Sequence, residues 1–227
     1  MAKGKNQNRE VVDDVENALT RTEQYIEENQ KSLMIIVAAI IVIVGGYLGY
    51  QRFLVAPQEK EASAQMFMAE RYFEQDSFRL ALNGDGMNYG FLDIIDEYSI
   101  TKSANLASYY AGISFLNLGE YKDAIDYLKD FDSTDEMVGP VSIGAMGDAH
   151  AELGEYDKAL SMYKKAASKA SNEFLSPIYL MKAGILYEQN GEYDKALEVY
   201  QEIEKEYKES REGRQIEKYI ARVKQMS

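Results

Sequence analysis

Few side chains in this chain could carry out chemistry. It contains one histidine, His150, and no cysteine. A catalytic nucleophile or general base normally draws on histidine, cysteine or converging carboxylates in a pocket. His150 occupies a helix position where an aromatic side chain is expected to pack against a paired helix, and we interpret it as structural. Without a second histidine or any cysteine a zinc site has little support. We therefore predict no catalytic residue, no cofactor and no enzymatic activity.

Two acidic groups and one glycine-rich stretch are candidate ligand sites. The acidic groups are Asp93, Asp96 and Glu97, and Asp132, Asp135 and Glu136. Neither has the Asp-rich, glycine-containing loop of a calcium hand, and acidic runs in a chain of net charge -13 are usually solvated. The stretch 83–86 lacks the lysine and the full glycine spacing of a phosphate-binding loop. We predict no metal and no small-molecule substrate.

The element that would position the rest of the protein is an apolar stretch near the N-terminus. Residues 32–51 are 20 consecutive uncharged residues between Lys31 and Arg52. At about 1.5 Å per residue a helix of this length reaches roughly 30 Å, the thickness of the bilayer's hydrocarbon layer. A cleaved signal peptide is the competing interpretation. The late start of the stretch, its acidic approach and the lack of a clear cleavage site disfavour it. We predict a transmembrane helix over 32–53.

The charges that flank this helix predict its orientation. Five basic residues precede it, whereas only Arg52 and Lys60 follow it closely. Because cytoplasmic flanks carry the excess of lysine and arginine, we expect a cytoplasmic N-terminus. Gly45 and Gly49 form a small-xxx-small pair that would allow another helix to approach, although the bilayer also tolerates such glycines. Before the helix, a polar segment over 1–31 carries a weak amphipathic stripe of Val12, Val15, Leu19, Thr22 and Ile26.

The remainder of the chain is acidic. Residues 32–227 carry 20 lysines and arginines against 31 aspartates and glutamates. Such a surface repels phosphates, and no basic patch with interleaved aromatic residues is present, so we predict no nucleic-acid binding. Partners of this region should be apolar, neutral or basic. The lack of cysteine leaves the redox compartment undetermined.

A repeated string predicts the fold. The residues from Gly154 to Leu160 recur letter for letter from Gly191 to Leu197, and a close variant runs from Gly119 to Ile125. A period of 35 to 37 residues is typical of stacked supersecondary units. In each unit small residues precede an aromatic position, a glycine turn, a tyrosine, an alanine and a large side chain. This pattern resembles the tetratricopeptide repeat over residues 104–207. The resemblance implies an all-α helical solenoid.

The repeat phasing gives the expected domain organisation: a cytoplasmic polar segment 1–31, a transmembrane helix 32–53, a linker 54–63, a degenerate first helical pair 64–103, three tetratricopeptide repeats 104–207 and a C-terminal capping helix 208–227. We expect the degenerate pair to comprise helices over 64–82 and 91–98. Ile216, Tyr219, Ile220 and Val223 would give the capping helix a single apolar stripe.

The order of parts resembles the YfgM family of bacterial membrane proteins. The residues that carry this resemblance are the approach from Glu28 to Lys31 and the end of the span from Gly49 to Phe53, followed by the repeats. The repeats here are more regular and richer in tyrosine than that family's. The resemblance implies a single-pass protein of the bacterial inner membrane with a periplasmic repeat domain. It further implies an ancillary subunit of the SecYEG translocon that works with a PpiD-like chaperone and nascent secreted polypeptides.

The first helix of each tetratricopeptide unit lines the concave face, which predicts the partner-binding groove. Phasing by the turn glycines places eight residues there: Tyr109, Ile113, Leu116, Val141, Asp148, Glu152, Met181 and Ile185. Their apolar majority favours an extended or helical polypeptide, and the two acids could attract basic segments. Several of them could instead pack between repeats, Leu116 and Ile185 above all. An assembly scaffold for another envelope complex, with no handling of unfolded clients, remains the alternative function.

Overall fold

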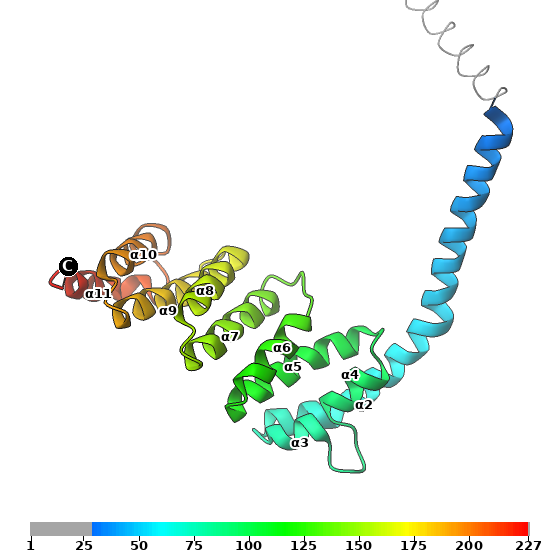
Figure 1. Cartoon of the computed structure of the whole chain (residues 1–227), viewed down its shortest axis with the longest axis horizontal. Coiled ribbons are helices and arrows are strands. Elements are labelled where there is room, and N and C mark those ends of the chain that lie inside the picture. Colours follow the sequence, from blue (N-terminus) through cyan, green and yellow to red (C-terminus); the bar gives the residue numbers. More distant parts are fainter. Residues whose placement is uncertain (1–28, 227) are drawn as a thin grey trace, which may run out of the picture. The chain divides into compact units, whose positions relative to one another are not determined.

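The computed structural model describes residues 29–226, which form helices and turns without a strand (Figure 1). The chain divides into two compact units, Met1–Pro57 and Gln58–Ser227, and each is described by itself. The predicted all-α fold is therefore confirmed. Most of the predicted polar segment 1–31, including its amphipathic stripe, lies outside the described residues.

The first unit contains the apolar helix. Its described part is α-helical over 29–50 and continues as the π-helix η1, Gln51–Val55. Its apolar side chains are nearly all exposed; Val42, for example, is 72% exposed. Among the described residues this is the one helix long and apolar enough to cross a membrane, judged by length and composition. A Cβ added at Gly45 or Gly49 would meet no atom within 4 Å. Contact of this pair with another helix stays a prediction.

The second unit opens with three helices, which corrects two predicted boundaries. Helix α2 covers Ala56–Glu74, α3 covers Phe78–Asn83 and α4 covers Phe91–Glu97. The expected linker over 54–63 is helical throughout, because α2 continues the preceding helix without a break. The π-helical turn η1 lies directly before Pro57, whose missing N–H interrupts the regular helical hydrogen bonding. The expected single helix over 64–82 is divided near Asp76, whose φ of 55° lies in the left-handed region.

These three helices pack onto the first helix of the repeats. Ala62, Leu82 and Phe91 are buried in one apolar cluster with residues of the first repeat, and the Phe91 ring stacks on Tyr110 at 5.1 Å. The loop between α3 and α4 is organised by the Asp85 carboxylate, which accepts hydrogen bonds from the backbone of Met87 and Asn88 and from the Tyr72 hydroxyl. The degenerate pair is thus a three-helix extension of the repeat stack.

Three helical hairpins follow where the repeats were expected: α5 (Lys102–Leu118) with α6 (Tyr121–Asp130), α7 (Val138–Glu152) with α8 (Tyr156–Ala170), and α9 (Ser176–Gln189) with α10 (Tyr193–Glu206). In each hairpin a glycine of the first helix faces a large side chain of the second: Gly112 faces Leu128, Gly147 faces Tyr163, and Gly184 faces Tyr200. A Cβ at Gly184 would lie 2.3 Å from Cε1 of Tyr200. The expected close approach at the small residues is therefore present.

The three hairpin turns have the same backbone conformation. Gly119, Gly154 and Gly191 have φ of 77°, 73° and 75°, in the left-handed region that favours glycine. After each glycine, the next N–H returns to a carbonyl of the preceding helix; the N–H of Glu155, for instance, donates to the oxygen of His150 at 2.9 Å. This is the hydrogen bond that closes a Schellman motif. The repeated Gly-Glu pair thus ends one helix before the next begins.

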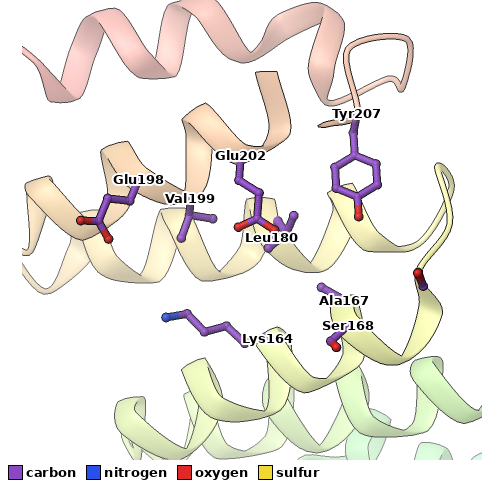
Figure 2. Close-up of a pocket in the computed structure, with 9 residues that line it drawn as sticks. Lys164, Ala167, Ser168, Leu180, Glu198, Val199, Glu202 and Tyr207 are labelled. Atoms are coloured by element: carbon purple, nitrogen blue, oxygen red, sulfur yellow. The ribbon is translucent and has the colours of Figure 1, made fainter. Parts of the chain in front are cut away.

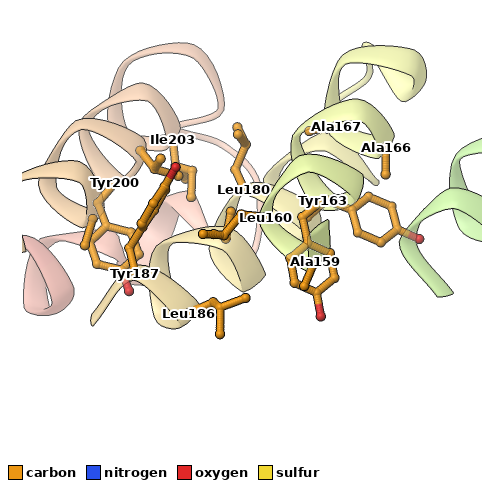
Figure 3. Packing of buried hydrophobic residues seen from close by; sticks show 14 of the residues in the cluster. Ala159, Leu160, Tyr163, Ala166, Ala167, Leu180, Leu186, Tyr187, Tyr200 and Ile203 are labelled. Atoms are coloured by element: carbon orange, nitrogen blue, oxygen red, sulfur yellow. The ribbon is translucent and has the colours of Figure 1, made fainter. Parts of the chain in front are cut away.

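A continuous core and a capping helix complete the unit. Buried side chains of the second and third hairpins belong to one cluster, in which four tyrosines provide the largest side chains: Tyr163, Tyr179, Tyr187 and Tyr200. Figure 3 shows three of them, Tyr163, Tyr187 and Tyr200. The short 3-10 helix η2, Gly213–Gln215, leads into α11, Ile216–Val223. Ile216, Ile220 and Val223 are buried, whereas Tyr219 is half-buried. The predicted apolar stripe thus covers the end of the stack.

Candidate partner-binding face

The exposed and half-buried side chains of α5, α7 and α9 form what we call the first-helix face. All eight residues predicted to bind a partner lie on these helices. Glu152 and Ile185 are exposed, and the other six are half-buried. The residues between them, such as Ala111, Ala149 and Ala183, are fully buried. The phasing by turn glycines therefore separates the outward positions from those that face the second helices.

Two adjoining hollows occupy this face. The first has a volume of about 330 Å³ and is lined by Leu116, Tyr121, Asp148, Ala151, Glu152 and Tyr163. The second has a volume of about 190 Å³ and is lined by Asp148, Ala151, Tyr163, Lys182, Ile185, Leu186 and Gln189. Since they share Asp148, Ala151 and Tyr163, they form one path from the first repeat to the third. Each hollow has room for one or two side chains of a partner.

The hollows bring together half of the predicted groove. Four of the eight residues line the hollows: Leu116, Asp148, Glu152 and Ile185. Leu116 and Ile185 are the two for which packing between repeats was the strongest alternative. Tyr109, Ile113, Val141 and Met181 do not line either hollow. Val141 and Met181 pack against the core cluster. The Tyr109 ring packs on Phe131 at 5.3 Å, and burial raises the pKa of its hydroxyl.

Asp148 lies where the two hollows meet, and its charge is balanced within the chain. The Lys182 ammonium lies 2.6 and 2.7 Å from the two oxygens of the Asp148 carboxylate. The Tyr163 hydroxyl also donates to Asp148 at 2.8 Å. Burial raises the pKa of Tyr163 far above its ordinary value, and the neighbouring Asp148 charge raises it further. Because Asp148 is already paired with Lys182 inside the chain, attraction of a basic partner to Asp148 stays a prediction.

The predicted groove does not include Lys182 or Tyr163, although both line the second hollow. The prediction considers only the outward positions within each first helix, and contacts between helices are not part of it. Asp148 and Lys182 are 34 residues apart, one helical turn less than the period of 37 that relates these two repeats. Positions related in this way face each other across adjacent first helices. An aspartate and a lysine 34 residues apart in adjacent first helices are thus the sequence signal that indicates this ion pair.

Glu152 carries the remaining negative charge of the first hollow. Its side chain is exposed and accepts one long hydrogen bond, 3.4 Å, from the Tyr121 hydroxyl. No lysine or arginine of the described residues forms an ion pair with it. A partner's basic side chain therefore has a carboxylate available at Glu152, beside the apolar surface of Leu116.

The residues whose types could carry out chemistry have structural roles. His150 is buried, and its Nδ1 lies 2.7 Å from Glu155 in the following turn. Asp135 accepts hydrogen bonds from the N–H groups of Met137 and Val138 at 2.8 Å, which lowers the pKa of its carboxyl. The described residues contain no group of three or more potential metal ligands. Asp93 likewise accepts a hydrogen bond from the Gly90 N–H, so one acid of each cluster bonds the start of a helix, α4 or α7.

Comparisons with known proteins identify the repeat. Models of the tetratricopeptide repeat match residues 106–133 and 145–210, which overlap the units expected over 104–207 and extend three residues beyond them. No curated protein matches the chain. Among solved structures it resembles the nearly identical TPR-like repeats of a candidate kinesin light chain from Podosopora anserina, with a TM-score of 0.56, 13% identity, and coverage of 74% of this chain and 87% of that chain. A point variant of that protein gives a TM-score of 0.55 and 12% identity with the same coverage.

The class of protein follows from the fold and these matches. The second unit is a helical solenoid that contains tetratricopeptide repeats, and domains of this class are protein–protein interaction scaffolds. Repeats of this class are generally not enzymatic.

Proposed function

We propose that this protein is a membrane-anchored scaffold that binds polypeptides on its first-helix face, as an accessory subunit of the Sec translocon. In this role the apolar helix spans the bacterial inner membrane once, with the N-terminus in the cytoplasm and the repeats in the periplasm. The repeats engage a PpiD-like chaperone or nascent secreted chains beside SecYEG. The observation that carries the binding function is the path of two hollows from Leu116 to Ile185.

The chemistry of this path favours a polypeptide segment with apolar and basic side chains. Leu116 offers apolar surface at the first hollow, Ile185 at the second and Ala151 at both. Glu152 offers an unpaired carboxylate, whereas the Asp148–Lys182 pair presents no net charge. A segment with an apolar side chain at Ile185 and a lysine or arginine at Glu152 would therefore satisfy the site. Unfolded secreted chains contain many such segments.

The apolar helix and the resemblance to the YfgM family support the location. A helix whose apolar side chains are nearly all exposed needs lipid or another apolar environment around it. Anchoring in the membrane that holds the translocon would keep the repeats near emerging chains and raise their effective concentration.

In-cell crosslinking of the full chain tests the location and the partner together. A photoreactive residue at Ile185 should crosslink to translocon components, to a periplasmic chaperone or to secreted chains, and a second at Gly49 would report the neighbours of the helix. Protease accessibility in sealed vesicles should place the repeats on the periplasmic side. Repeats found in the cytoplasm would refute the translocon role.

A matched pair of substitutions tests the binding face. Glu152→Gln should weaken binding of a basic, apolar peptide by about twofold to fivefold, the scale of one exposed charge contact. Glu204→Gln makes the same change of charge on α10, outside the two hollows, and should leave binding unchanged. If the protein ignores unfolded polypeptides and binds one folded envelope protein, the alternative role as an assembly scaffold is correct instead.

A further inference from the structure

A second surface lies on the second helices, α8 and α10, and it has an unusual distribution of charge. A cleft of about 460 Å³ separates these two helices, with Leu180 of α9 and Val199 at its floor (Figure 2). Lys164 and Ser168 line it from α8, and Glu198 and Glu202 line it from α10 (Figure 2). The two sides of the cleft therefore carry opposite charge.

The same opposition extends over the two whole helices. Helix α8 contains four lysines and one aspartate, whereas α10 contains five acidic residues and two lysines. Basic charge is thus concentrated on one helix of a strongly acidic protein. Both helices expose these side chains, since Lys164, Lys165, Glu198 and Glu202 are all exposed.

These charges are not used inside the chain. Within residues 29–226 no ion pair crosses the cleft, and the side chains of Glu198, Glu202 and Lys165 take part in no hydrogen bond or ion pair. Lys164 donates to the Tyr187 hydroxyl at 2.7 Å rather than to a carboxylate. By contrast, Lys158 on the same helix pairs with Glu155, and Lys195 on α10 pairs with Glu192. Lys164, Lys165, Glu198 and Glu202 are therefore among the side chains of these two helices that form no ion pair within the described residues, as are Asp157, Asp194 and Glu204.

We propose that this surface is a self-association interface, on which a second copy of the chain docks with a twofold axis running along the cleft. Rotation about that axis places α8 of one copy against α10 of the other, and α10 against α8. Lys164 and Lys165 then face Glu198 and Glu202 of the second copy twice over, as an isologous interface requires. An axis across the cleft would instead place lysines against lysines.

The charge pattern also sets the character of this contact. The floor residues Leu180 and Val199 are nearly buried, at 5% and 6% exposure, so the interface gains little apolar area. Association therefore depends on exposed ion pairs, which are weak and are screened by salt. We expect a salt-sensitive dimer. This inference does not rest on the proposed function, because the cleft and the first-helix face are lined by different residues.

Crosslinking at the cleft reports the contact directly. The chain has no cysteine, so Ser168→Cys in the full chain, held in detergent micelles, introduces a unique thiol beside the proposed axis. A short bis-maleimide should link two copies at low salt, and the yield should fall as salt is added. Lys122→Cys on α6 is the matched control and should give only the background of random collisions. A Ser168→Cys yield no higher than this control overturns the proposal.

Charge reversal tests the predicted pairing. In the Ser168→Cys background, Lys164→Glu with Lys165→Glu makes both sides of the cleft acidic, and Glu198→Lys with Glu202→Lys makes both basic. Each double variant alone should crosslink about tenfold less than the parent, since like charges would face each other. An equimolar mixture of the two should recover the yield, because opposite charges then meet on both sides.

The outcomes separate this interface from other causes of association. Helix content by circular dichroism should match that of the parent in all variants, since every changed residue is exposed. Association through the apolar helix would be indifferent to charge at the cleft, so undiminished crosslinking of either variant alone overturns the proposal. Failure of the mixture to recover the yield overturns it equally. Peptide binding at Glu152 should be unaffected throughout.

Discussion

Gly184→Ala is the sharpest test of how the hairpins pack. In an open helix this change stabilises by about 1 kcal/mol, because alanine is the better helix former. Here the new Cβ would lie 2.3 Å from Cε1 of Tyr200, where ordinary contacts begin at 3.4 Å, so the ring must retreat by about 1 Å. The ring cannot move freely, because Tyr200 is fully buried and its hydroxyl donates to Glu188 at 2.5 Å. Glu188 is itself held by Arg222.

We therefore expect the steric cost to exceed the gain in helix propensity. Overpacking a rigid core costs about 1–3 kcal/mol, and the pinned ring places this site at the upper end, which leaves a net loss of about 1–2 kcal/mol. For a domain of this size the loss corresponds to a fall of about 2–8 °C in Tm. Thermal unfolding of the full chain in detergent, followed by circular dichroism, measures it.

A double-mutant cycle isolates the contact with the ring. Tyr200→Val removes all three atoms that the new Cβ would meet, namely Cδ1, Cε1 and Cζ. In that background Gly184→Ala should be neutral or stabilising by up to about 1 kcal/mol. If Gly184→Ala raised the Tm of the otherwise unchanged protein, the packing argument for all three hairpins would be refuted.

Three further changes test the ends of the stack and one loop. Ile216→Ala should cost about 2–4 kcal/mol in chemical denaturation, because this 1% exposed side chain attaches the capping helix; an effect below about 1 kcal/mol would contradict the capping role. Thr101→Ala should cost about 1 kcal/mol in the same assay, since its hydroxyl accepts the Ala104 N–H at the start of α5, whereas Thr101→Ser should cost less. The pKa of Asp85 is lowered by hydrogen bonds, the largest effect coming from the backbone of Asn88. A depressed pKa contributes stability above the unfolded value of about 4, which is lost as pH falls through the folded value, so Asp85→Asn should destabilise near pH 7 and the deficit should shrink in acid. A deficit that is constant with pH would exclude this cause.

The sequence predicted the hairpins because three constraints recur at one period. A small residue for close approach, a left-handed glycine and a buried alanine such as Ala159 fix the same local geometry each time, and the repeated letters reveal all three. The N-terminal helices were less predictable because they have no repeat partner. The helix runs through Pro57 by way of the π-helical turn before it, and the chain turns at a left-handed Asp76; no repeated pattern marks either feature.

The candidate face was predicted in its positions but not in its electrostatics. Periodicity shows that Asp148 points outward, yet it does not show that the next first helix brings Lys182 within 2.6 Å. Of the two acids in the predicted groove, Asp148 is paired within the chain and Glu152 forms no ion pair among the described residues. Contacts between repeats depend on how far one first helix is shifted along its axis relative to the next. The hydrophobic pattern within a single helix does not determine that shift.

The divergence between identical repeats shows where specificity lies in this molecule. The second and third hairpins share seven residues that cover the turn and the start of the second helix. Their buried positions also match, with Ala159 equivalent to Ala196 and Tyr163 to Tyr200. Their outward positions differ: Lys165 on α8 is the counterpart of Glu202 on α10. Packing constrains the buried positions and leaves the outward positions free to vary, because exchanging one solvated side chain for another changes the free energy of unfolding little. Opposite charges on two otherwise equivalent helices are therefore not required for stacking, and an interface between copies gives them a role.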